Sequence, residues 1–167
     1  PVMRRRQGLI VARGNPHRLQ TLADASKRGL RMVNRQRGSG TRSMIDQLLA
    51  ANGLRPESIA GYAHEEFTHE AIAATVAAGQ ADVGFGIEAA AARYDLGFVP
   101  VVWERYGFAM LAATAASPEG KQFMARLHGN TFRQRLLAMP GYEPLAVCAP
   151  GEWARFLGEG RREKGEG

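Results

Sequence analysis

One segment, residues 30–50 (LRMVNRQRGSGTRSMIDQLLA), joins a short apolar strand to a glycine-containing loop and then to a helix. Residues 30–34 form an apolar run of strand length, and a loop through Gly40 follows it. Residues 42–51 then place their apolar side chains on one side of a helix, which Asn52 and Gly53 end. The segment therefore predicts a strand–loop–helix unit.

The same alternation continues in both directions along the chain. Further short strands are predicted at residues 8–12, 59–62 and 81–87, with helices at residues 19–28, 68–78 and 88–93. Two apolar runs follow at residues 98–102 and 106–111. Ser117, Pro118 and Glu119 then have the residue types that begin a helix, and residues 139–142 end the helical segment. Strands that alternate with helices predict α/β layers around a mainly parallel sheet, in which ligands bind beyond the carboxyl ends of strands.

Length and composition restrict the class of protein. The chain has 167 residues, 45% hydrophobic and 23% charged, which is typical of a soluble globular protein with one domain or two small lobes. No apolar run approaches the roughly 20 residues of a membrane helix, and a single cysteine, Cys148, excludes an internal disulfide. The basic N-terminus lacks the apolar core and the cleavage site of a signal peptide, so we expect a cytoplasmic protein.

The net charge of +6 comes mostly from arginines, which gather in three clusters. One cluster, Arg31, Arg35, Arg37 and Arg42, surrounds the glycine loop, whereas Arg4–Arg6 and Arg161–Arg162 are expected to be solvated ends. No zinc-finger spacing, basic zipper or RNP-like aromatic run accompanies the positive charge, which disfavours direct contact with nucleic acid. The central cluster is more consistent with attraction of small anions.

The loop between residues 34 and 42 is the strongest candidate site. Its glycines allow a tight turn and a close approach of ligand to backbone, and Ser39 and Thr41 offer hydroxyl groups. The free amides and the dipole at the start of the following helix favour an anion. The loop lacks the Gly-Lys-Ser/Thr ending of a Walker A motif. The alternative is a plain helix cap with solvated arginines. The residues assigned to the anion site from this loop are Arg35, Gly38, Ser39, Gly40, Thr41 and Arg42.

A second candidate loop covers residues 61–70. Thr68 is a plausible helix N-cap, and Tyr62, Thr68 and His69 are candidates to line the same pocket. The alternatives are surface capping and, less favoured, metal binding. His64 and His69 lie five residues apart and span the helix start, so they lack the spacing of a helical zinc motif. We therefore expect no metal and no cofactor.

Two further positions are candidates for ligand contact. Gly86 alternates with bulky residues in the strand at 81–87, so one strand face is bare and open either to a ligand or to a packed helix. Tyr106 follows an apolar run and can offer its hydroxyl to a cleft, or it can be an ordinary core residue. No nucleophile elbow or cysteine–histidine arrangement is present, so we expect a protein that is not an enzyme.

The motifs at residues 34–42, 61–62, 68–69 and 79–87 together resemble the periplasmic-binding-protein-like ligand domain of bacterial helix-turn-helix regulators and of proteins related to molybdate and molybdopterin. The segments 8–16, 98–106 and 140–142 extend the resemblance. It implies a type II fold, in which two α/β lobes close on a ligand. Related molybdate- and tungstate-binding proteins use a Ser-Gly-Thr-type loop, which here falls on Ser39, Gly40 and Thr41.

The resemblance also implies a division of the chain. We assign residues 1–29 to part of the first lobe and the crossover strand, 30–102 to the second lobe, 103–150 to the return into the first lobe, and 151–167 to a disordered polar tail. The first lobe is then incomplete, which exposes a sheet edge and makes a homodimer one expected arrangement.

The sequence thus predicts a domain that binds a small anion such as molybdate, tungstate, sulfate or phosphate. Two alternatives remain. One is the ligand-sensing module of a transcriptional regulator whose DNA-binding part is absent from this chain. The other is a protein related to molybdenum-cofactor biosynthesis.

Overall fold

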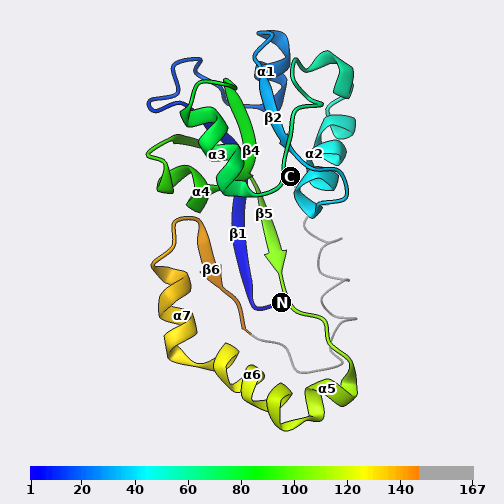
Figure 1. Ribbon diagram of the computed structural model, residues 1–167, viewed down its shortest axis with the longest axis vertical. Helices are drawn as coiled ribbons and strands as arrows, with labels where there is room; N and C mark the ends of the chain where they lie inside the picture. Colours follow the sequence, from blue (N-terminus) through cyan, green and yellow to red (C-terminus); the bar gives the residue numbers. More distant parts are fainter. Residues whose placement is uncertain (147–167) are drawn as a thin grey trace, which may run out of the picture. The chain divides into compact units, whose positions relative to one another are not determined.

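The computed structural model describes residues 1–146 (Figure 1), so Cys148 and the predicted tail at 151–167 lie outside the described residues. The strands are β1 (Met3–Val11), β2 (Met32–Arg35), β3 (Glu65–Glu66), β4 (Val83–Ile87), β5 (Gly97–Tyr106) and β6 (Tyr142–Pro144). The helices are α1 (Leu22–Lys27), α2 (Gly40–Ala51), α3 (His69–Ala77), α4 (Glu88–Arg93), α5 (Ala112–Ala116), α6 (Pro118–His128) and α7 (Asn130–Leu137), with a short 3₁₀ helix at Pro56–Ser58.

The sheet has the strand order β3-β2-β4-β1-β5, and β6 pairs with the beginning of β1. β2 is parallel to both β3 and β4, whereas β1 runs antiparallel to β4 and β6. The predicted α/β class, with parallel strands around the glycine loop, is confirmed.

The chain folds into two compact units. Unit 2 is Arg6–Trp103, and unit 1 combines Pro1–Arg5 with the chain from Glu104 onward. Both β1 and β5 have residues in each unit. Residues 6–29 therefore belong with residues 30–103, whereas the sequence-based division placed them with the first lobe. The physical reason is a shared core, in which Leu9, Leu19 and Leu22 pack with Met32, Ile45 and Phe85.

The faces of β4 explain how unit 2 is layered. Val83 and Phe85 are fully buried in the core that also holds residues of α1 and α2. Gly84 points to the opposite face, because side chains alternate along a strand. A Cβ built on Gly84 would lie 2.3 Å from Cγ2 of Ile72 in α3. The bare face of β4 therefore accommodates a packed helix, which was one of the two interpretations of its glycines.

Several predicted elements need correction. β1 begins at Met3 and not at Gly8, so the arginines at positions 4–6 lie in a strand and are not solvated ends. Arg4 pairs with Glu143 at 2.6 Å, Arg5 with Glu104 at 2.6 Å, and Arg6 with Glu88 at 2.7 Å. These carboxylates lie far away in sequence, and they balance charges that would otherwise disfavour a partly buried strand.

Other boundaries also differ. No strand forms at residues 59–62, which form turns instead; Gly61 has a φ of +75°, outside the strand region. The strand of this region is β3, at two glutamates. One continuous strand, β5, joins the first apolar run to Tyr106, and Gly129 separates α6 from α7. The predicted helix at 19–28 is shorter, because Thr21 and Asp24 form a capping box that starts α1 at Leu22.

Candidate functional site

The start of α2 is built by its N-cap. Ser39 has an extended backbone, and its Oγ accepts a hydrogen bond of 3.2 Å from the backbone N–H of Arg42. Gly38 precedes it with a φ of +84°, a conformation that favours glycine. A Cβ on Gly38 or Gly40 would meet nothing within 4 Å, so the space beside this turn is open. The amides of Gly40 and Thr41 lie in the first helical turn, where no acceptor exists within the helix.

The start of α3 repeats this construction. Thr68 is extended, and its Oγ1 accepts a hydrogen bond of 3.0 Å from the backbone N–H of Ala71. His69 is the first helical residue, and its imidazole packs against Gly86, where a Cβ would lie 3.0 Å from Nδ1. The predicted cap at Thr68 therefore forms, Ser39 caps α2 in the same way, and capping uses each hydroxyl as an acceptor. The hydroxyl hydrogens remain as donors.

The parallel strands bring the two helix starts to the same edge of the sheet. β2 and β3 are paired with Asn34 opposite Glu65, and their carboxyl ends therefore coincide. Beyond the strands, the Gln36 N–H donates to the Glu66 carbonyl at 3.0 Å, and Arg35 Nη2 donates to the Phe67 carbonyl at 3.0 Å. The loop before α2 is thus tied to the loop before α3.

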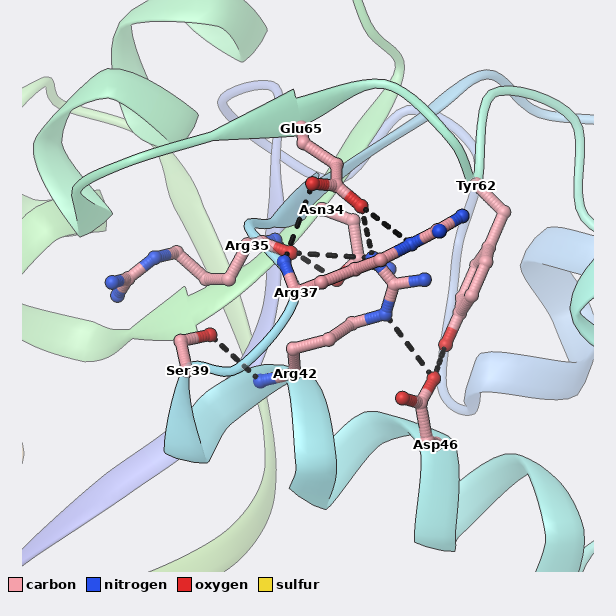
Figure 2. Close-up of polar contacts among 8 residues, drawn as sticks. All are labelled: Asn34, Arg35, Arg37, Ser39, Arg42, Asp46, Tyr62 and Glu65. Atoms are coloured by element: carbon pink, nitrogen blue, oxygen red, sulfur yellow. Dashed lines mark hydrogen bonds and ion pairs between the residues drawn. The ribbon is translucent and has the colours of Figure 1, made fainter.

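The guanidinium of Arg42 is held from several sides (Figure 2). Its Nη1 donates to Glu65 Oε1 at 2.9 Å and to the Arg35 carbonyl at 3.3 Å, and its Nε donates to Asp46 Oδ1 at 3.2 Å. The side chain is only 9% exposed. Arg42 is therefore committed to partners within the chain, and its charge balances two carboxylates.

Glu65 is the second centre of this cluster. Besides Arg42, it accepts a hydrogen bond from the backbone N–H of Arg37 at 3.2 Å and lies 3.4 Å from Arg37 Nε. The backbone N–H of Arg37, followed by the Arg42 and Arg37 side chains, holds the pKa of the Glu65 carboxyl below its usual range, despite some opposing desolvation. The carboxylate is therefore charged at neutral pH.

Tyr62 closes the other side of the cluster. Its hydroxyl donates a hydrogen bond to Asp46, and its ring lies under the Arg42 guanidinium, 4.5 Å from the ring centroid (Figure 2). Burial and the neighbouring Asp46 raise the pKa of Tyr62 to about 12. Beside this cluster lies an open pocket of about 370 Å³, lined by Arg37, Arg42, Pro56, Glu57, Ile59, Gly61, Tyr62 and Ala63.

The structure therefore brings most of the sequence-predicted site residues together in unit 2. Tyr62 lies on the Arg42 side of the loop, and the space beside Gly86 is filled by His69 and Ile10. Tyr106 belongs to unit 1, where its ring lies 5.0 Å from the Arg5 guanidinium and packs edge-on against Phe108.

Within residues 1–146 no group of three or more histidine, cysteine, aspartate or glutamate side chains is placed to hold a metal. None of the helices described there is long and apolar enough to cross a membrane.

Sequence reasoning missed three residues of this cluster: Asn34, Asp46 and Glu65. Asp46 stands four residues after Arg42 in a predicted helix, a spacing that signals an ion pair. Glu65 carried no such signal, because its partners lie more than 20 residues away. Asn34 is fully buried at the end of β2, and its side-chain oxygen accepts from the Arg35 N–H at 2.9 Å.

A parallel sheet whose carboxyl edge carries two capped, open helix starts is the architecture of a ligand-binding α/β domain. The model of the PBP superfamily domain matches residues 1–128, and the chain belongs to this periplasmic-binding-protein-like family. The resemblance stated from the sequence is thereby confirmed.

Known relatives agree with this assignment. The uncharacterized protein YvgK of Bacillus subtilis is 32% identical over 142 residues, which are 85% of this chain and 46% of YvgK. A histidine kinase sensor domain with similarity to periplasmic binding proteins superposes with a TM-score of 0.57 at 16% identity, over 87% of this chain and 63% of that one. A substrate-binding domain from Clostridium difficile, named as that of a molybdenum ABC transporter, superposes with a TM-score of 0.55 at 15% identity. The match covers 86% of this chain and 65% of that domain. The chain thus spans about half the length of YvgK, and the two structures support the fold alone.

Proposed function

We propose that this domain binds a small tetrahedral oxyanion, of the molybdate or tungstate kind, at the start of α2. The observation that carries the proposal is the joint presentation of two capped helix starts, at Ser39 and Thr68, along one sheet edge. The C. difficile domain named for molybdenum transport has the same fold, which is consistent with a ligand of this class.

The chemistry of the site suits an anion. The first-turn amide of Gly40 lies beside open space at the positive end of the helix dipole, which favours negative charge, whereas Thr41 is buried. The hydroxyl of Ser39 retains its hydrogen, which an anion oxygen can accept. Such a site resembles the helix N-termini at which phosphate and sulfate groups bind in many proteins.

The arginines have an indirect role in this proposal. Arg42 and Arg37 are engaged with Glu65, and Arg35 donates to the Phe67 carbonyl. They shape the loop and add to the surrounding positive field, while neutral donors contact the anion. We further propose that the ligand is bound without turnover, because the donors around the open turn include no activated nucleophile.

The direct test is isothermal titration calorimetry of the full chain with molybdate, tungstate, sulfate and phosphate, with chloride at matched ionic strength as control. We expect saturable binding of at least one oxyanion and a rise in melting temperature, because a ligand selective for the folded state stabilises it. Recovery of the oxyanion unchanged after incubation tests binding without turnover. Absence of saturable binding for all four oxyanions would contradict the proposal.

A second candidate is a sensing role, in which ligand binding controls another part of a longer protein. The likeness to a histidine kinase sensor domain and the 46% coverage of YvgK favour this candidate. This candidate corresponds to the alternative of a ligand-sensing module in a transcriptional regulator, whose DNA-binding part is absent from this chain. A protein extended with a DNA-binding segment should change its DNA affinity when the oxyanion is added, and an unchanged affinity would argue against sensing.

A further inference from the structure

Glu65 occupies donors that belong to the proposed anion-binding loop. The backbone N–H of Arg37, one residue before Gly38, donates to Oε2 at 3.2 Å. The side chains of Arg37 and Arg42 approach Oε1 at 3.4 and 2.9 Å. A carboxylate from β3 therefore sits where the loop presents positive charge (Figure 2).

The carboxylate has two separable effects. As an acceptor, the Glu65 carboxylate holds Arg37 and Arg42 against β3, which supports the shape of the turn. As a negative charge, it offsets the field of two arginines. The Glu65 side chain is 28% exposed, so this offset is only partly screened by water.

We propose that Glu65 is an internal counter-anion that sets the affinity of the oxyanion site. This inference rests on the proposed function. Glu65 keeps the loop ordered when no ligand is bound, and its charge opposes an incoming anion. Asp46 does not duplicate this role, because it contacts Arg42 from the α2 side together with Tyr62 and makes no contact with the loop amide.

The test separates charge from shape with Glu65→Gln, measured by calorimetry with molybdate in the full chain. Glutamine keeps one acceptor oxygen and removes the charge. We expect binding to tighten roughly threefold to tenfold at low ionic strength, as expected for one charge acting at moderate distance near the surface. The gain should shrink as salt is added.

Glu66→Gln is the matched control. Glu66 is the neighbouring residue of β3, so its side chain points to the other face of the sheet, and the change removes the same formal charge. We expect its molybdate affinity to stay within about twofold of the wild-type protein. Glu65→Asp is the second variant: it keeps the charge but shortens the reach, and it should bind molybdate no more tightly than the wild type.

The outcomes are distinct. If the wild-type protein binds molybdate and Glu65→Gln binds no more tightly than Glu66→Gln, the role of Glu65 is wrong while the proposed function stands. If neither the wild type nor Glu65→Gln binds any oxyanion, the proposed function itself fails. Should Glu65→Gln not fold, the double variant Glu65→Gln/Arg42→Gln, which removes both partners of this ion pair, is compared with Arg42→Gln alone. Tighter molybdate binding in the double variant supports the proposal, and equal or weaker binding overturns it.

Discussion

The Arg42 guanidinium lies over the ring of Tyr62, 4.5 Å from the ring centroid, while the hydroxyl of the same tyrosine donates to Asp46. Asp46 in turn accepts from Arg42 Nε at 3.2 Å. The three side chains form a closed triangle behind the candidate anion site. The positive charge of Arg42 is thereby retained in a buried place next to an aromatic face.

This triangle predicts a dependence of stability on alkaline pH. The pKa of Tyr62 is raised from 10.0 to about 12, so the folded state holds the phenolic proton more tightly than the unfolded state. This contribution to stability is complete below about pH 10 and is lost as the pH rises toward 12. Urea denaturation at several pH values between 9 and 12 should show a steeper loss for the wild type than for Tyr62→Phe.

The control for this prediction is the stability difference between the wild type and Tyr62→Phe at pH 8. There Tyr62→Phe lacks the hydrogen bond to Asp46 but keeps the ring under Arg42, so we expect a loss of about 1–2 kcal/mol. Parallel alkaline curves for the two proteins would show that the Tyr62 proton is not coupled to folding.

The N-cap of α2 provides a prediction that separates helix stability from ligand binding. Ser39→Gly should cost only a few tenths of a kcal/mol, because glycine is tolerated at the N-cap, whereas Ser39→Ala should cost about 1 kcal/mol. Both changes remove the hydroxyl donor. We therefore expect both variants to lose most of the rise in melting temperature caused by molybdate.

Ser117→Gly is the control for this pair. Ser117 caps α6 in unit 1 with the same geometry, its Oγ accepting from the Gly120 N–H at 3.1 Å. The control should keep the full response to molybdate. If molybdate raised the melting temperature of Ser39→Gly as much as that of the wild type, the Ser39 hydroxyl would not be a ligand contact.

The packing of α3 on β4 predicts a large loss for a small change. A Cβ on Gly84 would lie 2.3 Å from Ile72 Cγ2, closer than side-chain atoms approach. Gly84→Ala should therefore destabilise the protein by about 1–3 kcal/mol, measured by urea denaturation. Ile72→Ala opens the same space, so the double variant should lose less than the sum of the two single losses. Additive losses would mean that the two residues do not compete for space.

The sequence predicted those features that depend on local signals. Thr68 and Ser117 are predicted as helix N-caps, because a capping side chain bonds to an amide only a few residues ahead. Ser39 is predicted as a ligand hydroxyl, and α2 begins at Gly40, two residues before the predicted start. α4 begins and ends where it was predicted. The parallel strands could then be inferred from the alternation of these units with apolar runs.

The predictions from sequence were wrong where a residue's interaction partners lie far away along the chain. The start of β1 is a run of arginines, whose charges are balanced by the distant carboxylates of Glu88, Glu104 and Glu143. β3 consists of two glutamates, and its pairing with β2 decides its structure more than its own residues do. Likewise, the sequence predicts Arg42 as a ligand contact, but its guanidinium is bound by Glu65, a partner 23 residues away.

Gly40 offers a test of where the ligand lies. It is the first residue of α2, and a Cβ there would meet nothing within 4 Å. Gly40→Ala should therefore leave the unliganded protein as stable as the wild type, or more stable by up to about 1 kcal/mol, because alanine favours the helix and restricts the unfolded chain. The added methyl group points into the space that the proposed oxyanion needs to reach the first-turn amides. We expect the variant to bind molybdate at least tenfold more weakly in calorimetry, while its melting temperature without ligand is unchanged or higher. Wild-type affinity in Gly40→Ala would place the anion away from the start of α2, at another part of the sheet edge.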